Sequence, residues 1–299
     1  MKKFKYKNGN YEVIIFEDGT KIRRTLENKF VPEFSESCDV KVTDKCKVGC
    51  KFCYEGCTKE GKHGDLFGYN FINTLHSYTE LALNGNDLDH PKLEEFLKFL
   101  KTKKVFPNIT LNQKQYKENY DKVKEWKKEK LIYGIGISYS KGDVDWLLQN
   151  INLPDIVIHT IVGILGEDDI KALSDHNLKL LLLGYKNLGR GVKYLEGNEE
   201  KIKKNIKYLS DNLLSISKHF SVLSFDNLSI NQLDLKNKMS EEEWNRFYMG
   251  DDGEFTFYID LVKGEFAKDS LSQVRYKIKP EMTIDDMFKV IRDEEGKLK

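Results

Sequence analysis

The chain has 299 residues, of which 39% are hydrophobic and 32% are charged, with 49 Lys and Arg against 48 Asp and Glu. This composition supports a folded core and excludes a disordered chain, and a net charge of +1 argues against a nucleic-acid or membrane partner. The polar N-terminus lacks the apolar segment of a signal peptide, and no run approaches the roughly 18 apolar residues of a membrane helix. We therefore expect a cytoplasmic protein with reduced thiols rather than disulfides.

The first predicted elements are β-strands. Residues 4–24 predict a hairpin, because "YEVIIF" and "KIRRTL" flank "EDGT", in which Asp-Gly is a strong turn signal. Residues 1–35 are predicted to be a short N-terminal extension. Cys38, Val40 and Val42 then alternate with polar residues, which predicts a strand that ends just before a cysteine-rich segment.

Strands and helices alternate over residues 36–228. Counting the strand at 38–42, seven strands are expected, the others lying at 80–85, 108–113, 133–140, 154–165, 178–185 and 221–226. The helices predicted between them include one helix over 114–130, one capped by Asp143, and a long one over 198–217. Apolar strands separated by helices predict an α/β fold with a parallel sheet that helices cover.

The last segment, 229–299, breaks this alternation and predicts a C-terminal α+β extension. Ser240 and Glu243 form a capping-box pattern, and Thr283 is placed to cap a last helix. Between these helices, the sequence predicts a hairpin that turns at Lys263-Gly264. The extension contains no cysteine, so all five thiols of the chain precede it.

Four of the five cysteines lie within the twelve residues "CKVGCKFCYEGC". Cys46, Cys50 and Cys53 are close enough in sequence for three thiolates to bind one zinc or iron–sulfur centre. A structural zinc ion prefers four ligands, for which Cys57 or His63 could be the fourth. Alternatively, three cysteines on a [4Fe–4S] cluster leave one iron open to a small molecule.

The pattern C-x3-C-x-aromatic-C, complete with Phe52 and directly after a predicted strand, resembles the cluster loop of radical S-adenosylmethionine (SAM) enzymes. The resemblance implies a partial (β/α)6 TIM-like barrel over residues 36–228. It also implies a [4Fe–4S] cluster on Cys46, Cys50 and Cys53, with SAM on the open iron. A one-electron donor such as flavodoxin or ferredoxin would reduce the cluster, and a 5′-deoxyadenosyl radical would abstract hydrogen from the substrate.

The resemblance also assigns SAM contacts. The segment Asn84-Gly85-Asn86 stands where the family has Gly-Gly-Glu, which binds the SAM amino group, so only Gly85 matches. Asn112 and Ser138, near the ends of middle strands, are candidates for the ribose.

Further candidates follow the later strands. Gly163 stands where the family's adenine site is expected, and Arg190 is a candidate for the SAM carboxylate or for the substrate, together with Tyr185 and Lys186. Cys57 is expected to be an idle thiol, the alternative being a hydrogen donor to a substrate radical.

The substrate follows less directly from the sequence. A peptide or protein is favoured because related peptide-modifying enzymes also have C-terminal extensions, and a small metabolite and a nucleic acid come next. The alternative functions are a non-enzymatic iron–sulfur or zinc protein, and a family member that binds a cluster without cleaving SAM.

Overall fold

The computed structural model describes residues 2–16, 19–84, 88–153 and 155–297. A ten-stranded, mostly parallel sheet dominates it, in the order β10-β9-β8-β7-β6-β5-β4-β11-β12-β13. Its first seven strands in the chain are β4 (Ser37–Lys41), β5 (Glu80–Asn84), β6 (Phe106–Asn112), β7 (Gly134–Ser138), β8 (Ile156–Ile161), β9 (Lys179–Leu183) and β10 (Val222–Phe225). These seven strands confirm the predicted ones. Among the described strands, β10 and β13 are the edges, so the sheet is open.

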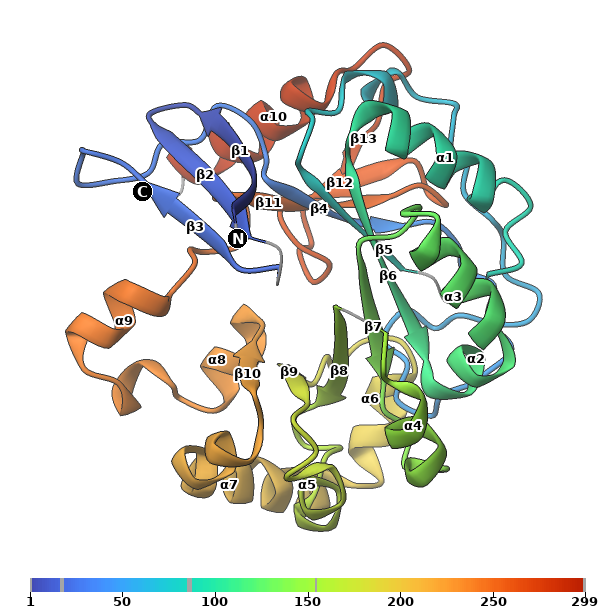
Figure 1. The fold of residues 1–299 in the computed structure, drawn as a ribbon, viewed down its shortest axis with the longest axis vertical. Coiled ribbons are helices and arrows are strands. Elements are labelled where there is room, and N and C mark those ends of the chain that lie inside the picture. The colour runs from blue at the N-terminus through green and yellow to red at the C-terminus, as the bar shows by residue number, and fades with distance from the viewer. Residues whose placement is uncertain (1, 17–18, 85–87, 154, 298–299) are drawn as a thin grey trace.

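Helices cover the outer face of the curved sheet, as Figure 1 shows. They are α1 (Leu93–Lys103), α2 (Gln113–Glu118), α3 (Tyr120–Lys128), α4 (Val144–Asn150), α5 (Glu167–Leu173) and α7 (Glu199–Ile216), whereas α6 (Arg190–Glu196) lies between β9 and α7 in the chain and begins at the carboxyl edge of the sheet. Alternate strand residues such as Leu81, Leu83, Ile109 and Leu111 are buried in the main core that these helices complete. The predicted α/β architecture is therefore confirmed in outline.

Two local predictions about helices are wrong. The single helix expected over 114–130 is divided into α2 and α3 at Asn119, where φ is −120° and the side chain donates a hydrogen bond to the Gln115 carbonyl at 2.9 Å. This local bond competes with helix continuation. Asp143 precedes α4 in the left-handed region, at φ 50°, and its carboxylate pairs with Lys117 at 2.9 Å instead of capping the helix.

The inner face of the sheet is polar and partly open to solvent. Asp39 in β4 is exposed, and its register partners Ala82 and Asn108 are half-buried, whereas the neighbouring strand residues are buried in the core. Because side chains alternate between the two faces of a strand, the helices bury one face and leave the other available for a ligand.

The N-terminal segment forms a second sheet of three antiparallel strands, β1 (Lys2–Asn8), β2 (Tyr11–Phe16) and β3 (Lys21–Arg24). The expected hairpin is present as β2 and β3, and β1 adds a strand that the sequence analysis missed. This small sheet meets the main sheet at the amino ends of its strands. There, Glu36 accepts hydrogen bonds from Tyr11 and Arg23, both at 2.7 Å.

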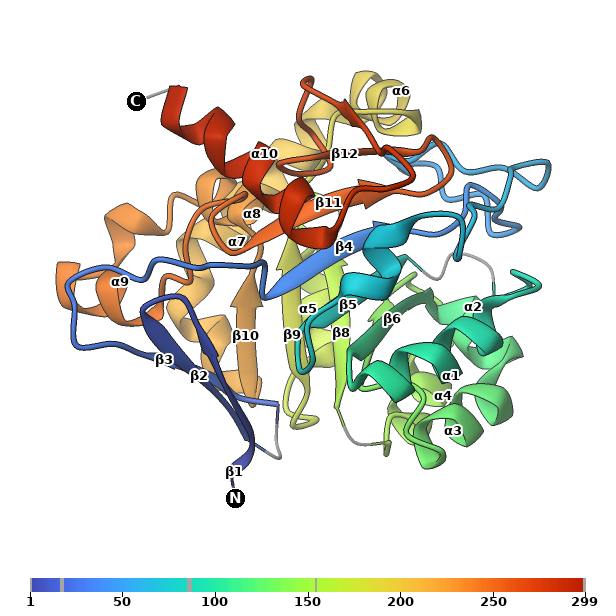
Figure 2. The same ribbon diagram turned by 90° about the horizontal axis from the view of Figure 1, so that it is seen from above.

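The C-terminal segment continues the main sheet. It contains α8 (Asn227–Gln232), α9 (Glu241–Phe247), β11 (Thr256–Asp260), β12 (Glu265–Ala267), β13 (Tyr276–Lys277) and α10 (Ile284–Lys297). Strand β11 pairs in parallel with β4 and then turns back antiparallel as β12, which confirms the predicted hairpin at Lys263-Gly264. Figure 2 shows β11 and β12 beside β4, on the side away from β5. The predicted caps Ser240 and Thr283 are both present.

Candidate functional site

The cysteine-rich segment is a loop that leaves the carboxyl end of β4. Cys46, Cys50 and Cys53 are half-buried, whereas Cys57 is buried. The loop folds back on itself, because the Cys46 amide donates to the Thr58 carbonyl at 2.7 Å and the Thr58 amide donates to the Asp44 carbonyl at 3.1 Å. Its shape is thus held by backbone bonds, which leaves the thiols available for other contacts.

Arg190 fastens this loop to the start of α6. Its Nε donates to the Cys50 carbonyl at 2.9 Å, and its Nη1 donates to the Cys57 carbonyl at 2.8 Å. Its own amide donates to the Cys53 carbonyl at 3.0 Å. Gly189 before it has φ +53°, and a Cβ there would lie 2.4 Å from the Tyr54 carbonyl oxygen, so only glycine fits this approach. Arg190, a sequence candidate for binding SAM or substrate, contacts the cysteine loop itself.

We predict that Arg190→Ala loosens this loop and lowers the free energy of unfolding by about 2 kcal/mol, as expected for the loss of charged hydrogen bonds. Chemical denaturation measures the change. Lys193→Ala, on the exposed face of the same helix, is the matched control and should change the free energy by less than about 0.5 kcal/mol. Equal stability of the two variants would show that the Arg190 contacts do not hold the loop.

The thiols influence one another's ionisation. Burial raises the pKa of Cys50, and the nearby charges of Cys53 and Cys46 raise it further, while Arg190 acts in the opposite direction. A hydrogen bond from the Cys57 thiol lowers the pKa of Cys53, and the same bond raises the pKa of Cys57. The loop therefore brings the three motif thiols into electrostatic contact and keeps Cys57 protonated beside them.

Asn112 is a predicted SAM contact whose side chain reaches the sulfur of a motif cysteine. Its Nδ2 donates to Cys50 Sγ at 3.9 Å, while its Oδ1 accepts from the Lys114 amide at 2.9 Å and caps α2. Ser138 is its register partner on β7, one strand farther along the same edge. Asn84 ends β5 in register with Lys41 and Thr110. Gly85 and Asn86 lie outside the described residues.

The remaining predicted cofactor residues pack elsewhere around this edge. Phe52 meets the Tyr194 ring of α6 edge-on, with 5.7 Å between the ring centres. Gly163 has φ +87°, and its carbonyl accepts from Asn205 at 2.9 Å, so it supports packing against α7. His63, a candidate zinc ligand, lies 3.0 Å from the Thr43 hydroxyl through its Nδ1.

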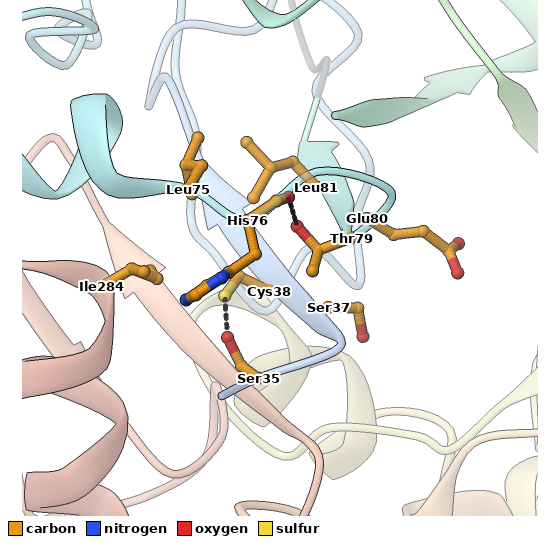
Figure 3. A pocket seen from close by; sticks show the side chains of 9 residues that line it. All are labelled: Ser35, Ser37, Cys38, Leu75, His76, Thr79, Glu80, Leu81 and Ile284. Carbon is orange, nitrogen blue, oxygen red and sulfur yellow. Dashed lines mark hydrogen bonds between the residues drawn. The ribbon is translucent and has the colours of Figure 1, made fainter. Parts of the chain in front are cut away.

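Cys38, the fifth cysteine, lies near the amino end of β4, the end opposite the loop. Figure 3 shows its sulfur beside the Ser35 hydroxyl, at 3.5 Å, among Leu75, Leu81 and Ile284. The cavity there measures about 10 Å³, which is at most enough for one water molecule. Cys38 is thus a core residue, as the sequence analysis expected.

Two sets of contacts at the site were not found by sequence reasoning, although Lys186, which takes part in the second, was a predicted candidate for SAM or substrate. Lys41, 3% exposed, forms ion pairs with Asp44 at 2.5 Å, Glu55 at 2.6 Å and Asp260 at 3.5 Å, and so joins β4, the cysteine loop and β11. Tyr54, next to Cys53, is covered by the Lys186 ammonium group, 4.1 Å from its ring centre.

The Lys186 contact continues into the C-terminal segment, because Lys186 also donates to the Ser270 hydroxyl at 2.7 Å. The Lys41–Asp260 pair and the two contacts of Lys186 join positions more than 80 residues apart in the chain. Asp44 and Glu55 lie closer to Lys41, but their only local signal is a polar residue within a loop.

His159 lies on the inner face, in register with Ser138. Its ring covers Gly136, where a Cβ would lie 2.3 Å from the ring, so a larger residue there would displace the imidazole. Burial lowers the pKa of His159 to about 4, which keeps the imidazole neutral at physiological pH. A neutral imidazole both donates and accepts hydrogen bonds, so it is suited to orienting a polar ligand on this face.

This lowered pKa predicts how stability depends on pH. Below a pH of about 6.5, His159 is protonated in the unfolded chain but stays neutral in the folded protein. The free energy of unfolding therefore falls as the pH drops from about 6.5 to about 4. We expect His159 to account for about 3 kcal/mol of that loss. Denaturation of His159→Gln across this range should show a flatter dependence than the unchanged protein. His176→Gln, at an exposed position, is the control, and equal slopes for all three proteins would contradict the assignment.

Comparisons with known proteins do not assign the site. No model of a known protein family matches the chain, and no curated protein matches it. Among the described ranges, no helix combines the length and apolar composition needed to cross a membrane.

The loop's fit to a metal group depends on the thiols themselves. Within the part of the chain that the structure describes, no three His, Cys, Asp or Glu side chains surround a point where a single ion could sit. A [4Fe–4S] cluster binds each thiolate to a different iron, so its ligands stand farther apart than those of one ion. Cys46, Cys50 and Cys53 are half-buried on a loop that Arg190 fixes, and three thiolates are the kind of donor set that such a cluster takes.

Proposed function

We propose that this protein is a radical SAM enzyme whose [4Fe–4S] cluster binds Cys46, Cys50 and Cys53. The observation that carries the proposal is the cysteine loop, with the full C-x3-C-x-aromatic-C pattern, at the carboxyl end of the first strand of a parallel sheet. In sheets of this type, active sites gather at the carboxyl ends of the strands. Within the proposal, strands β4–β9 and their helices correspond to a partial (β/α)6 barrel.

The bound cluster would supply the electron that cleaves SAM, yielding the 5′-deoxyadenosyl radical that abstracts hydrogen from the substrate. The residues of this chain would hold the cysteine loop and the cofactor in position. Arg190 fixes the loop through its carbonyls, and Asn112 donates to Cys50. Asn84 and Ser138, at the carboxyl ends of β5 and β7, would orient polar groups of SAM.

The C-terminal segment supports the site in this proposal. Tyr258 donates to Glu55 at 3.3 Å, and Ser270 accepts from Lys186 beside Tyr54, so two points of the segment contact the surroundings of the cysteine loop. Such contacts restrict the access of water, which a radical reaction requires. The electron would come from a donor such as flavodoxin or ferredoxin, and a peptide or protein is the favoured substrate class.

Anaerobic purification tests the proposal. We expect a brown protein with about four irons per chain that releases 5′-deoxyadenosine from SAM under dithionite. A colourless protein with one zinc would favour the zinc-binding alternative. A cluster without SAM cleavage would indicate an electron-transfer protein or a family member without turnover. Either result would overturn the proposed enzyme.

A further inference from the structure

A pocket of about 580 Å³ lies outside the cysteine site and is formed mainly by the C-terminal segment. Its walls come from α8, from the turn after it, from α9, and from the residues that follow β12. The volume falls within the range of about 300–1,000 Å³ typical of small-molecule sites.

One wall of the pocket is aromatic. The rings of Trp244 and Tyr248 stack with 4.4 Å between centres and an angle of 18° between their planes. The Lys236 ammonium group lies 5.6 Å from the centre of the Trp244 ring, so a cation already occupies the electron-rich surface of this pair. A rigid aromatic surface of this kind attracts alkyl chains and organic cations.

The other walls are predominantly acidic. Four aspartates, Asp234, Asp251, Asp252 and Asp269, line the pocket together with two lysines, Lys236 and Lys268. Asn227 donates to Asp252 at 3.0 Å, and the backbone amides of Leu271 and Ser272 donate to Asp269 at 2.6 and 2.8 Å, so these two carboxylates are fixed in position. The excess of carboxylates predicts a preference for a cationic ligand.

The pocket connects to the proposed reaction site through neighbouring residues. Burial raises the pKa of Asp252 to about 6, and the charges of Asp269, of Asp39 in β4 and of Asp226 add to that rise. Asp252 is thus close enough to sense Asp39 on the inner face of the sheet. Asp269 precedes Ser270, whose hydroxyl accepts a hydrogen bond from Lys186. The Lys186 ammonium group lies over the ring of Tyr54, the residue next to Cys53.

We propose that this pocket binds a guanidinium or ammonium group at the end of an alkyl chain, with the cation at Asp252 and Asp269 and the chain along Trp244 and Tyr248. The pocket would be the part of the site that recognises the substrate, so this inference rests on the proposed function. The substrate class that it names is a molecule with a basic side chain. Binding itself requires only the folded pocket.

The test measures the equilibrium affinity of small basic ligands for the full-length, anaerobically purified protein. Calorimetry and tryptophan fluorescence report the binding. The probe is Nα-acetyl-arginine amide, and its neutral isostere Nα-acetyl-citrulline amide is the control. We expect the arginine compound to bind at least about 10-fold more tightly, as an added charge interaction of about 1.4 kcal/mol would give. Agmatine, titrated in parallel, distinguishes a free amine from an amino-acid side chain as the source of the cation. Equal affinity for the two amides, or binding of neither amide nor agmatine, would overturn the proposal.

Two variants locate the binding. Asp252→Asn should weaken binding of the arginine compound about 10-fold, and Trp244→Ala should weaken it and remove the fluorescence response. Asp211→Asn, on the exposed side of α7, is the matched control and should leave binding unchanged. Thermal unfolding shows that each variant is folded, and a folded Asp252→Asn protein with unchanged affinity would contradict the assignment.

The two proposals can fail separately. Binding of the arginine compound without SAM cleavage would contradict the proposed enzymatic activity but support the proposed ligand class of the pocket. SAM cleavage with no charge-dependent binding would support the proposed enzyme but contradict the proposal that its substrate has a basic side chain.

Discussion

Cys50→Ala is expected to abolish SAM cleavage and to reduce bound iron to a small fraction of its level in the unchanged protein. A cube bound by only two thiolates and open at two irons is poorly retained, and Cys50 lies between Cys46 and Cys53 in the loop and in electrostatic contact with both. The side chain is half-buried and the loop backbone is fixed by Arg190, so the sheet should still fold. Iron analysis and visible absorption measure the loss of the cluster, release of 5′-deoxyadenosine measures SAM cleavage, and chemical denaturation shows whether the sheet is folded.

Two other cysteines provide matched controls for this experiment. Cys38→Ala removes a core thiol near the opposite end of β4 and should keep full iron content. Cys57→Ala removes the hydrogen bond to Cys53 but no proposed ligand, so the cluster should remain. Loss of iron in Cys57→Ala would indicate that Cys57 is a fourth ligand, which would contradict the proposal that one iron is open to SAM. Full SAM cleavage by Cys50→Ala would show that the ligand assignment is wrong.

The repeating part of the fold was predictable because each strand carries its own signal. "LKLLLLGY" and "NITLNQ" are apolar on the face that packs against helices, and burial is decided locally by that alternation. The position of the cysteine loop after the first strand of the main sheet was predictable for a similar reason, since its cysteines lie close together in the sequence. The division between α2 and α3 at Asn119 was not predictable, because it depends on one side-chain hydrogen bond to the Gln115 carbonyl within an otherwise helical pattern.

Features made by distant partners could not be predicted. The contact of Arg190 with the carbonyls of Cys50 and Cys57 joins positions 140 and 133 residues apart. The sequence places Arg190 at the correct edge of the sheet but does not show whether its guanidinium meets a cofactor or the loop. Likewise, the pocket beside Asp252 needs α8, α9 and the segment after β12 together, and no sequence motif indicates that these three lie side by side.

The pairing of β11 with β4 explains why the C-terminal segment matters to the site. Asp260 is the register partner of Lys41, and Tyr258 is the register partner of Asp39. The segment thereby supplies one of the three carboxylates around Lys41 and a hydrogen bond to Glu55 between Cys53 and Cys57. Truncation before β11 would thus remove both contacts from the loop.

Lys41→Met is expected to destabilise the protein by about 3–5 kcal/mol, the cost of leaving buried charges without their partner. Burial alone would lower the pKa of Lys41, but the charge of Glu55 and the contacts with Asp44 and Asp260 outweigh burial and raise it, so the ammonium group is charged in the folded protein. Without it, Asp260, which is 2% exposed, and Glu55 would face each other as uncompensated carboxylates. Chemical denaturation measures the loss, and iron content reports the effect on the loop.

Lys47→Met is the matched control, because Lys47 pairs with Asp89 in the same region but with both side chains more than half exposed. An exposed pair contributes about 0–1 kcal/mol, so this variant should retain nearly full stability. Adding Asp260→Asn to Lys41→Met removes one of the uncompensated charges and should recover part of the lost stability, a coupling that a double-mutant cycle isolates. If Lys41→Met and Lys47→Met were equally stable, or if Asp260→Asn gave no recovery, the charge cluster would not be what joins the C-terminal segment to the cysteine loop.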